Sequence, residues 1–432
     1  MRYLVSLLVC LVLYAATNVA ARSIMTGCRA SVEDGVIKDS GLSVSGISSG
    51  AFAAHQILYA YSSLLDGAGL VAGGPWFSAQ ANVALAVSLM KDPSLVNVPL
   101  LLKEYHASVA TGFLDPHECL KSTRSFVFAS PRDTVVHYGV STRLVTLQTA
   151  LNASHVSHHE IQAEHSFPTA AFGNDCMYLG PMYINACGFD TAGYILDVVS
   201  VEGTLRAPAS DLLPESNFYR VRQAPFAKLM PPLSLATVGL DSVAYAYIPT
   251  NCRHVLDYST VRDTIMPWTG EAPEQPVDAD ATPESIAADI AAAERAFAKL
   301  HGENTIPASL RTEALLQMRA RGGHYLRAGP NASMRSGVGN ETASCRVHVA
   351  MHGCEQTRDN LGSTFAQYAG YNRWAESNNI VMLYPFAVAN VLNPKGCWDW
   401  WGYSSTAYAS KLAPQTLMVM RMLTAFRYNQ ML

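Results

Sequence analysis

Short apolar runs alternate with longer helix-like stretches along most of the chain, and this alternation is typical of an α/β protein. The strand candidates are residues 42–44, 67–72, 125–129, 244–248, 346–351 and 380–384. The chain closes on a helix-like segment at residues 414–426. We therefore predict an α/β fold in which an early and a late block of the chain contribute strands to one sheet.

A long segment, residues 253–344, interrupts this pattern. Its stretch at 271–280 is acidic and rich in proline, which predicts an exposed loop. Two helices are expected to follow, at 282–300, where Thr282-Pro283 provides a cap and first turn, and at 308–321. The segment is either a surface decoration or a lid over the site, and both hypotheses remain open.

The first residues have the pattern of a secretory signal peptide. A basic start is followed by an uncharged apolar stretch at residues 4–16 and by small residues up to Ala21. The alternative, a membrane anchor, is disfavoured because the apolar stretch is shorter than the roughly 20 residues that span a bilayer. We predict a signal peptide at residues 1–21, an extracellular location, and no membrane association after cleavage.

Composition excludes some partners. About half of the 432 residues are hydrophobic, which is enough for a substantial core. Lys and Arg total 30 against 34 Asp and Glu, and no basic run is present, so we do not expect a nucleic-acid partner. The sequence gives no prediction of the oligomeric state.

The cysteines predict disulfide bonds. Removal of the signal peptide also removes Cys10 and leaves an even number of cysteines in a chain bound for an oxidising compartment. None of their spacings has the paired Cys-x-x-Cys form of a zinc site, so we expect neither a metal nor an organic cofactor. Sequons at Asn152, Asn331 and Asn340 are compatible with a glycosylated surface.

The strongest chemical motif is Gly46-Ile47-Ser48-Ser49-Gly50, which follows the first strand candidate and precedes an alanine-rich helical stretch. A Gly-x-Ser-x-Gly sequence in this context predicts a nucleophile elbow, the sharp strand-to-helix turn that holds a reactive serine above a sheet. A serine hydroxyl is a poor nucleophile unless a histidine accepts its proton and a carboxylate orients that histidine.

Asp133 and His165 are the candidates for these two roles. Asp133 follows the strand candidate at 125–129, and a loop there would place it at the same sheet edge as Ser48. His165 lies further along, which completes the chain order Ser, Asp, His expected for an α/β-hydrolase. His137 is a weaker candidate base.

A second group of histidines offers a rival site. His155, His158 and His159 are spaced for one face of a helix and could bind a metal, but beside a sequon we expect them to be solvated surface residues.

An oxyanion hole requires main-chain N–H groups aimed at the developing negative charge. The residue after the nucleophile, Ser49, supplies one from the start of a helix. The strand candidate at 346–351 ends in His352-Gly353, the form of an esterase oxyanion loop, which normally precedes the nucleophile. Here it follows the nucleophile, so we interpret it as the front of a hydrolase domain moved to its back, which is a circular permutation.

With these residues placed, the chain resembles the secreted poly(3-hydroxybutyrate) depolymerase family, in the type whose oxyanion residue follows the catalytic triad in the sequence. The motifs that carry the resemblance are Val44-Ser45-Gly46-Ile47-Ser48-Ser49-Gly50, Val71-Ala72-Gly73-Gly74-Pro75, Asp133-Thr134-Val135, His165-Ser166-Phe167-Pro168-Thr169, Gly239-Leu240-Asp241, His352-Gly353-Cys354, Tyr371-Asn372-Arg373-Trp374-Ala375 and Asn393-Pro394-Lys395-Gly396-Cys397-Trp398-Asp399-Trp400. They extend over about residues 41–252 and 345–426.

The resemblance implies a circularly permuted α/β-hydrolase fold with a single catalytic domain, residues 22–252 and 345–432, and an insertion at 253–344. It also assigns the residues of the site. Ser48 would be the nucleophile, His165 the base and Asp133 its orienting carboxylate, while the Ser49 and Cys354 amides would form the oxyanion hole.

The chain departs from the family at Trp76-Phe77-Ser78, where a cysteine is often found, so one familiar disulfide is absent. Cys119 must then pair elsewhere, and Cys28 is the suggested partner. The other suggested pairs are Cys176 with Cys187, Cys252 with Cys345, and Cys354 with Cys397.

Four aromatic residues, Trp398, Trp400, Trp401 and Tyr403, lie close together beside Cys397. They are too dense for all of them to be buried easily, and we expect some to line an apolar groove that binds substrate.

We therefore predict a secreted serine esterase that hydrolyses poly(3-hydroxybutyrate) or its oligomers, or another hydrophobic ester, through an acyl-enzyme. The alternatives are a feruloyl, acetylxylan or lipase-like esterase on the same triad, and a non-catalytic secreted binding protein with a hydrolase frame.

Overall fold

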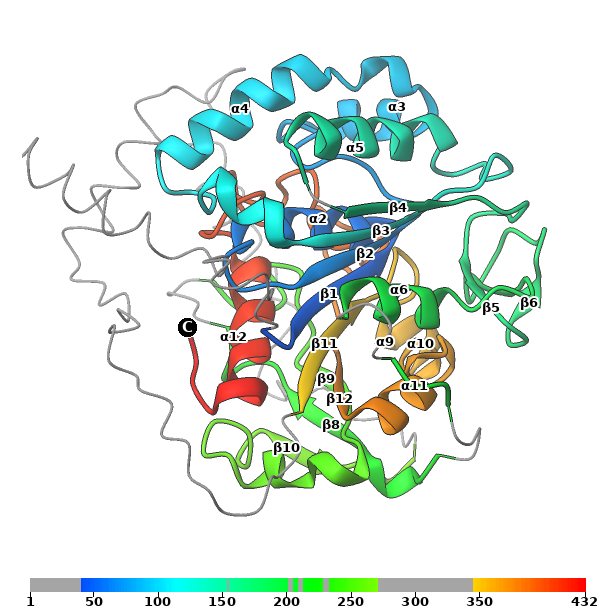
Figure 1. Ribbon diagram of the computed structural model, residues 1–432, viewed down its shortest axis with the longest axis vertical. Helices are drawn as coiled ribbons and strands as arrows, with labels where there is room; N and C mark the ends of the chain where they lie inside the picture. The colour runs from blue at the N-terminus through cyan, green and yellow to red at the C-terminus, as the bar shows by residue number, and fades with distance from the viewer. Residues whose placement is uncertain (1–39, 154, 201–204, 209–212, 228–232, 271–344) are drawn as a thin grey trace, which may run out of the picture.

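The computed structural model describes residues 40–153, 155–200, 205–208, 213–227, 233–270 and 345–432 (Figure 1). Within these ranges a twisted nine-stranded sheet runs through the molecule, and a smaller three-stranded sheet lies beside it. The strands of the large sheet are, in spatial order, β10 (Ile265–Pro267), β8 (Phe218–Arg222), β9 (Val243–Tyr247), β12 (Ile380–Tyr384), β11 (Arg346–Met351), β1 (Leu42–Ile47), β2 (Gly67–Val71), β3 (Arg124–Phe128) and β4 (His155–His159).

The part of this sheet from β12 to β4 is parallel, whereas β9, β8 and β10 extend it as an antiparallel edge. The last strands in the chain, β11 and β12, therefore lie in the middle of the sheet. Ser45 of β1 pairs with Ala350 of β11 on one side and with Gly69 of β2 on the other. Both blocks of the chain thus build one sheet, as the strand pattern predicted.

Helices cover both faces of the sheet (Figure 1). Successive residues of a strand point to opposite faces, and in β12 Val381 and Leu383 belong to one buried cluster while Ile380, Met382 and Tyr384 belong to the other. The helices on the first face are α2 (Ser49–Ala60), α3 (Val83–Lys91), α4 (Val98–Ala110), α5 (Tyr138–Ala150) and α12 (Pro414–Tyr428). Those with residues in the second cluster are α6 (Thr191–Val199), α10 (Thr364–Tyr368) and α11 (Tyr371–Asn378). A short helix, α9 (Arg358–Leu361), precedes α10.

The central helix α2 follows β1 directly, and every one of its residues is buried. A helix buried on all sides has no need of a polar face, which explains why its sequence is rich in alanine and aromatic residues. Its position fixes the residue at the β1–α2 turn in the middle of the fold, at the carboxyl end of the parallel strands.

The small sheet consists of β5 (Phe167–Thr169), β7 (Ile184–Ala186) and β6 (Asn174–Asp175). The 3-10 helices are η1 (Pro93–Leu95), η2 (His117–Ser122), η3 (Glu215–Asn217) and η4 (Thr250–Asp257). η4 extends beyond residue 252, and β10 is an edge strand of the large sheet.

Most predicted elements are confirmed. The strands predicted at 346–351 and 380–384 have the bounds of β11 and β12, and the predicted closing helix corresponds to α12. One prediction is wrong: residues 155–159 form strand β4, which pairs in parallel with β3, so the helical spacing assumed for His155, His158 and His159 does not apply.

Several predictions fall outside the described residues. These are the signal peptide at 1–21, the two helices expected at 282–300 and 308–321, and the sequons at Asn331 and Asn340. The domain boundaries and the role of the segment 253–344 stay predictions.

Three of the suggested disulfides are present. They join Cys176 to Cys187, Cys252 to Cys345 and Cys354 to Cys397. Cys119 is also disulfide-bonded, and its suggested partner, Cys28, lies outside the described residues.

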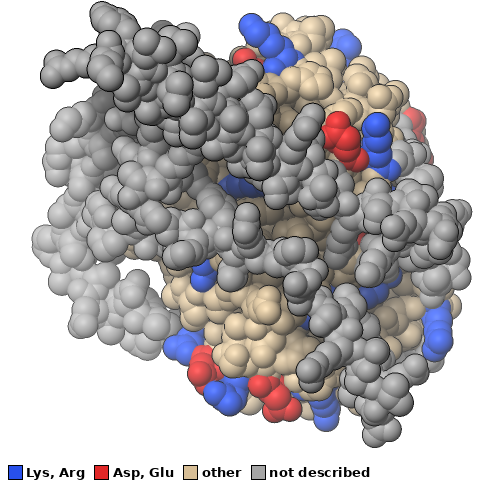
Figure 2. All heavy atoms as spheres, turned by 60° about the vertical axis from the view of Figure 1, so that its left-hand side comes forward, with Lys and Arg blue, Asp and Glu red and all other residues tan. Residues whose placement is uncertain are grey.

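On the face shown in Figure 2, acidic and basic side chains are interspersed over the part of the surface that the structure describes. Most of this surface consists of other residues. Among the described helices, none is long and apolar enough to cross a bilayer.

Candidate active site

Ser48 occupies the sharp turn between β1 and α2. Its backbone has a φ of 54° and a ψ of −122°, a conformation that costs a non-glycine residue roughly 1–3 kcal/mol and occurs mainly where function requires it. The Ser48 amide donates a hydrogen bond to Val71 O at 2.8 Å, which anchors the turn to β2. The structure therefore has the strand, strained turn and helix that the pentapeptide predicted.

The two glycines of the pentapeptide are required by close main-chain packing. A Cβ on Gly46 would lie 2.3 Å from the carbonyl carbon of Gly50, and a Cβ on Gly50 would lie 2.4 Å from His352 O. Neither distance is compatible with a side chain, so both positions must be glycine. The second contact also shows that the start of α2 packs directly against the end of β11.

Asp133 and His165 form a buried pair. Asp133 follows β3, and its Oδ2 accepts a hydrogen bond from His165 Nδ1 at 2.7 Å. Its other oxygen, Oδ1, accepts hydrogen bonds from the amides of Val135 and Val136, each at 2.8 Å. The carboxylate is therefore held in one orientation, and the Nδ1 proton of His165 is fixed, which leaves Nε2 available as a base.

Glu164 connects the loop that carries Asp133 with the loop that carries His165. Its Oε1 accepts hydrogen bonds from the amides of Thr134 and His165, and its Oε2 accepts one from the Thr134 hydroxyl. These bonds join the residues next to the aspartate and the histidine. The sequence analysis missed this function, although a carboxylate directly before the histidine was visible.

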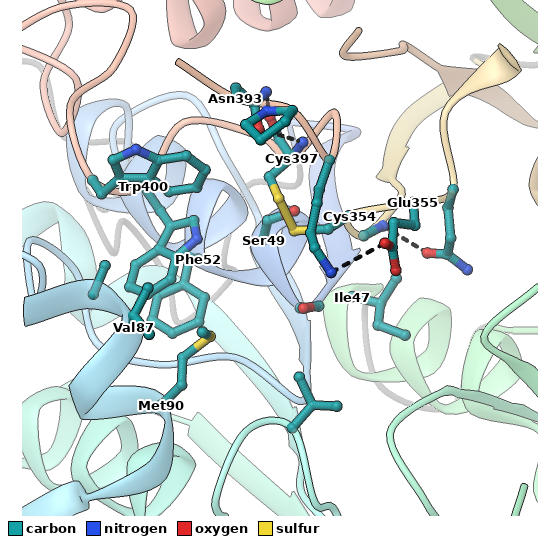
Figure 3. A pocket seen from close by; sticks show the side chains of 18 of the residues that line it. Ile47, Ser49, Phe52, Val87, Met90, Cys354, Glu355, Asn393, Cys397 and Trp400 are labelled. Carbon is teal, nitrogen blue, oxygen red and sulfur yellow. Dashed lines mark hydrogen bonds and ion pairs between the residues drawn. A yellow bond between two sulfur atoms is a disulfide. The ribbon is translucent and has the colours of Figure 1, made fainter. Parts of the chain in front are cut away.

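Ser48 and His165 both line a cavity of about 460 Å³ at the carboxyl end of the sheet (Figure 3). The structure thus brings the predicted serine and the Asp133–His165 pair into one site. His137, the weaker candidate base, instead accepts a hydrogen bond from the Gly139 amide as the cap of α5 and is not among the residues that line the cavity.

The two predicted oxyanion donors, Ser49 and Cys354, also line the cavity. The loop after β11 lies against the nucleophile, because a Cβ added to Gly353 would be 3.3 Å from Ser48 Cβ. The disulfide between Cys354 and Cys397, with a Cα separation of 4.1 Å, fixes this loop to the loop that carries the aromatic cluster.

His352 is hydrogen-bonded to the loop that follows β11. Its Nε2 accepts a hydrogen bond from the Ala387 amide at 3.0 Å, so its proton is on Nδ1, which donates to Gly353 O at 2.6 Å. Burial lowers the pKa of His352 to about 4, and the ring is therefore neutral near pH 7. This histidine contributes to loop geometry and not to proton transfer.

Gln356 is also hydrogen-bonded to this loop. Its Oε1 accepts a hydrogen bond from the Gly353 amide, and its Nε2 donates to Met182 O, both at 2.6 Å. Phe167, two residues after His165, has its amide bonded to Tyr183 O. Gln356 thereby links the loop after β11 to the segment that supports the histidine.

The structure separates the four aromatic residues into two pairs. Trp400 and Trp401 line the cavity, where Trp400 stacks on Phe52 with ring centroids 4.1 Å apart. Trp398 and Tyr403 are buried and are not among the lining residues; the Tyr403 hydroxyl donates to Cys397 O. The two residues in the middle of the turn thus face the cavity, and the two at its ends pack into the interior.

Asp399 shapes the turn that carries these tryptophans. Its carboxylate accepts hydrogen bonds from the amides of Trp401, Gly402, Tyr403 and Ser404, and from the Ser404 hydroxyl. Burial raises the pKa of Asp399, while these donors lower it.

Helix α3 supplies a wall of the cavity that the sequence analysis did not assign. Val83, Val87 and Met90 line it together with Phe52 of α2. In Figure 3 the side chains of Phe52, Val87 and Met90 lie on the opposite side of the view from Glu355. Their spacing of four and three residues was visible in the sequence, but it does not tell which neighbour that helical face would meet.

Among the described residues, no group of three or more His, Cys, Asp or Glu side chains could hold a metal ion. The chemistry that the site offers is that of a buried histidine–carboxylate pair next to a serine on a strained turn, with main-chain donors close by.

Comparison with known proteins supports the resemblance. No family model matches the chain. A poly(3-hydroxybutyrate) depolymerase from Delftia acidovorans is 28% identical over 383 residues, which cover 88% of this chain and 58% of that protein. A polyhydroxybutyrate depolymerase from Talaromyces funiculosus is 24% identical over 389 residues, which cover 86% of this chain and 85% of the relative. The chain therefore spans little more than half the length of the Delftia relative.

Two solved structures share the fold. A PHB depolymerase complexed with an R3HB trimer aligns with a TM-score of 0.63 and 21% identity, covering 91% of this chain and 97% of that one. The PHB depolymerase from Penicillium funiculosum aligns with a TM-score of 0.61 and 22% identity, covering 89% and 94%. The predicted α/β-hydrolase fold and the resemblance to the PHB depolymerase family are both confirmed.

Proposed function

We propose that this chain is a secreted serine esterase that hydrolyses the ester bonds of poly(3-hydroxybutyrate) or of its oligomers. The observation that carries the proposal is the 2.7 Å bond between Asp133 and His165, because His165 lines the same cavity as Ser48 on its strained turn. The matched relatives named as PHB depolymerases support the substrate class. The extracellular location rests on the sequence of the first 21 residues.

In the proposed mechanism the Ser48 hydroxyl attacks the ester carbonyl while His165 Nε2 accepts its proton. The carbonyl oxygen becomes negatively charged, and the amides of Ser49 and Cys354 stabilise it. Protonated His165 then donates its proton to the departing alkoxide, which leaves as an alcohol. Water, deprotonated by the same histidine, attacks the acyl carbonyl. His165 then returns this proton to the Ser48 oxygen as the acyl–oxygen bond breaks, which releases a hydroxy acid or a shorter oligomer.

The walls of the cavity fit this substrate class. Phe52, Met90 and Trp400 present apolar surface close to the reacting serine. A polyester of short hydroxy acids consists of apolar segments joined by uncharged ester groups, and such segments gain free energy when they leave water for an apolar wall.

The first test is Ser48→Ala, with Ser94→Ala as a matched control because Ser94 is exposed and does not line the cavity. Loss of the nucleophile should lower kcat on a short acyl ester by about five to six orders of magnitude, and labelling by a serine-directed phosphonate should disappear. The control should keep both. Labelling that persists in Ser48→Ala would exclude Ser48 as the nucleophile.

The second test decides the substrate class. Release of 3-hydroxybutyrate from its oligomers is measured beside release of ferulate and of acetate from their esters under the same conditions. We expect a higher kcat/KM for the hydroxybutyrate oligomers. A higher value for ferulate or acetate esters would replace the proposal with a feruloyl or acetylxylan esterase.

A further inference from the structure

Three polar side chains, Tyr183, Glu355 and Lys395, lie together in the lining of the otherwise largely apolar cavity. The Tyr183 hydroxyl donates a hydrogen bond to Glu355 Oε2 at 2.8 Å, and Lys395 Nζ lies 3.1 Å from Glu355 Oε1. The pKa of Tyr183 is raised to about 12, mainly by burial and secondly by the hydrogen bond to Glu355. Its hydroxyl therefore stays a neutral donor. The proposed mechanism uses none of these groups.

Lys395 is held close to the oxyanion loop by three connections. The Glu355 amide donates to Lys395 O at 2.8 Å, the Glu355 carboxylate pairs with the Lys395 ammonium, and the disulfide between Cys354 and Cys397 spans the same two loops. Figure 3 shows Glu355 beside Cys354 and this disulfide. The ammonium group therefore lies beside Glu355, the residue that follows the predicted oxyanion donor Cys354.

The ammonium can accept a second anionic partner. Both oxygens of Glu355 have partners, whereas an ammonium has three N–H donors and the ion pair uses only part of this capacity. The side chains of Lys395 and Glu355 are 65% and 40% exposed, and exposed ion pairs contribute little net free energy. A second carboxylate can thus share the lysine without a large loss. Among the described residues that line the cavity, Lys395 is the only lysine or arginine.

A linear oligomer of hydroxy acids matches this arrangement. It consists of apolar ester units with a hydroxyl at one end and a carboxylate at the other, and this carboxylate is its single charge near pH 7. The cavity volume of about 460 Å³ lies within the range of sites that enclose small molecules, roughly 300–1,000 Å³. One cation at the edge of an apolar cavity is complementary to one anionic end of a short apolar chain.

We propose that Lys395 binds the terminal carboxylate of a short, soluble hydroxy-acid oligomer, and that Glu355 and Tyr183 position its ammonium group. The inference rests on the proposed function and makes it more specific, because it assigns the chain a preference for carboxylate-terminated oligomers over uncharged ester chains. Lys395 acts on the specificity of the enzyme and takes no part in the proton transfers.

The experiment compares the linear trimer of 3-hydroxybutyrate as the free acid with its methyl ester, in which the terminal charge is masked by a methyl group. Only cleavage between hydroxybutyrate units is counted, and release of methanol from the ester is measured separately. kcat/KM is measured for both with the wild type, Lys395→Met and Lys395→Glu. Lys103→Met and Lys103→Glu are the matched controls, since Lys103 is exposed on α4 and lies outside the cavity lining, while each control changes the net charge equally.

We expect Lys395→Met to lower the ratio of kcat/KM for acid over ester by about three- to fivefold, mainly through KM, as for an exposed charge pair. Lys395→Glu should lower it further, and the controls should leave it unchanged. In 1 M NaCl the wild-type ratio should fall towards that of Lys395→Met, because the Debye length shrinks to about 3 Å.

The outcomes separate the two proposals. An acid-to-ester ratio that is equal in the wild type, Lys395→Met and the controls overturns the role of Lys395 while leaving the esterase intact. If the wild type cleaves neither trimer nor the polymer, the proposed function fails. Binding of the free acid to Ser48→Ala, measured by calorimetry with and without Lys395→Met, then still tests the carboxylate site: equal affinities would refute it.

Discussion

The exchange of Asp133 for asparagine gives a sharp test of the proposed triad, because the structure fixes how the new amide must lie. Asp133 Oδ1 accepts hydrogen bonds from two amides, and Oδ2 accepts one from His165 Nδ1. In Asp133→Asn the amide oxygen can satisfy either the two main-chain donors or the histidine, but not both.

The energetic balance favours the main-chain donors. Turning the amide so that its NH₂ faces the amides of Val135 and Val136 would leave one partly buried and one buried donor without an acceptor, at about 1–3 kcal/mol each. The orientation with the NH₂ group towards the main chain would therefore lie roughly 2–6 kcal/mol above the orientation with the oxygen towards it. At most about one molecule in thirty would adopt the less stable orientation. In the favoured form the NH₂ group donates to His165 Nδ1, so the histidine proton moves to Nε2.

His165 then cannot accept the proton of Ser48. We expect kcat on a chromogenic short-chain ester to fall by at least about 30-fold, and by up to roughly 10⁴-fold as for an incorrect histidine tautomer in a serine protease. The free energy of unfolding in urea should change by less than about 1 kcal/mol, since the main-chain bonds are kept. Asp197→Asn, on the exposed face of α6, is the control. A kcat for Asp133→Asn within threefold of the wild type would refute the reasoning.

Three further predictions concern the framework of the site. Gly50→Ala should lower the free energy of unfolding in urea by about 1–3 kcal/mol and reduce kcat, because its Cβ would meet His352 O at 2.4 Å; unchanged stability would show that the main chains can separate. Asp399→Asn should raise KM more than it lowers kcat, because its NH₂ group would face main-chain donors around the aromatic turn; an unchanged KM would exclude this role. Burial lowers the pKa of His348 to about 3 in the folded protein. As the pH drops from 7 to 5, this histidine becomes protonated in the unfolded chain but not in the folded one. The free energy of unfolding should therefore fall, by about 2 kcal/mol for this residue. His348→Gln should reduce the pH-dependent loss, measured as urea unfolding at both pH values, by that amount, and an unchanged loss would contradict the assignment.

The parts of the site that could be predicted from the sequence depend on local patterns. The β1–α2 turn could be predicted because its glycines, serine and flanking strand are adjacent in the chain. Asp133 could be predicted because it follows a strand-like run, and parallel strands bring their carboxyl ends to one edge. His165 could be predicted because it completes the chain order Ser, Asp, His.

Other features depend on contacts between distant segments and could not be predicted. The spacing of His155, His158 and His159 fits a helix, but pairing with β3 makes the segment a strand. The density of aromatic residues at 398–403 predicted a groove, yet only the fold decides that Trp400 faces the cavity and Trp398 the interior.

The sheet order has a consequence for how the chain can be made. β1 carries the nucleophile, and its partner on one side is β11, so Leu42 must wait for Val347 to be synthesised before the central ladder can close. Until then one edge of β1 is unpaired, and contacts between such distant segments form slowly. The same order makes shortened chains hazardous: a product that ends before residue 346 would leave the edge of β1 exposed to other chains and should aggregate.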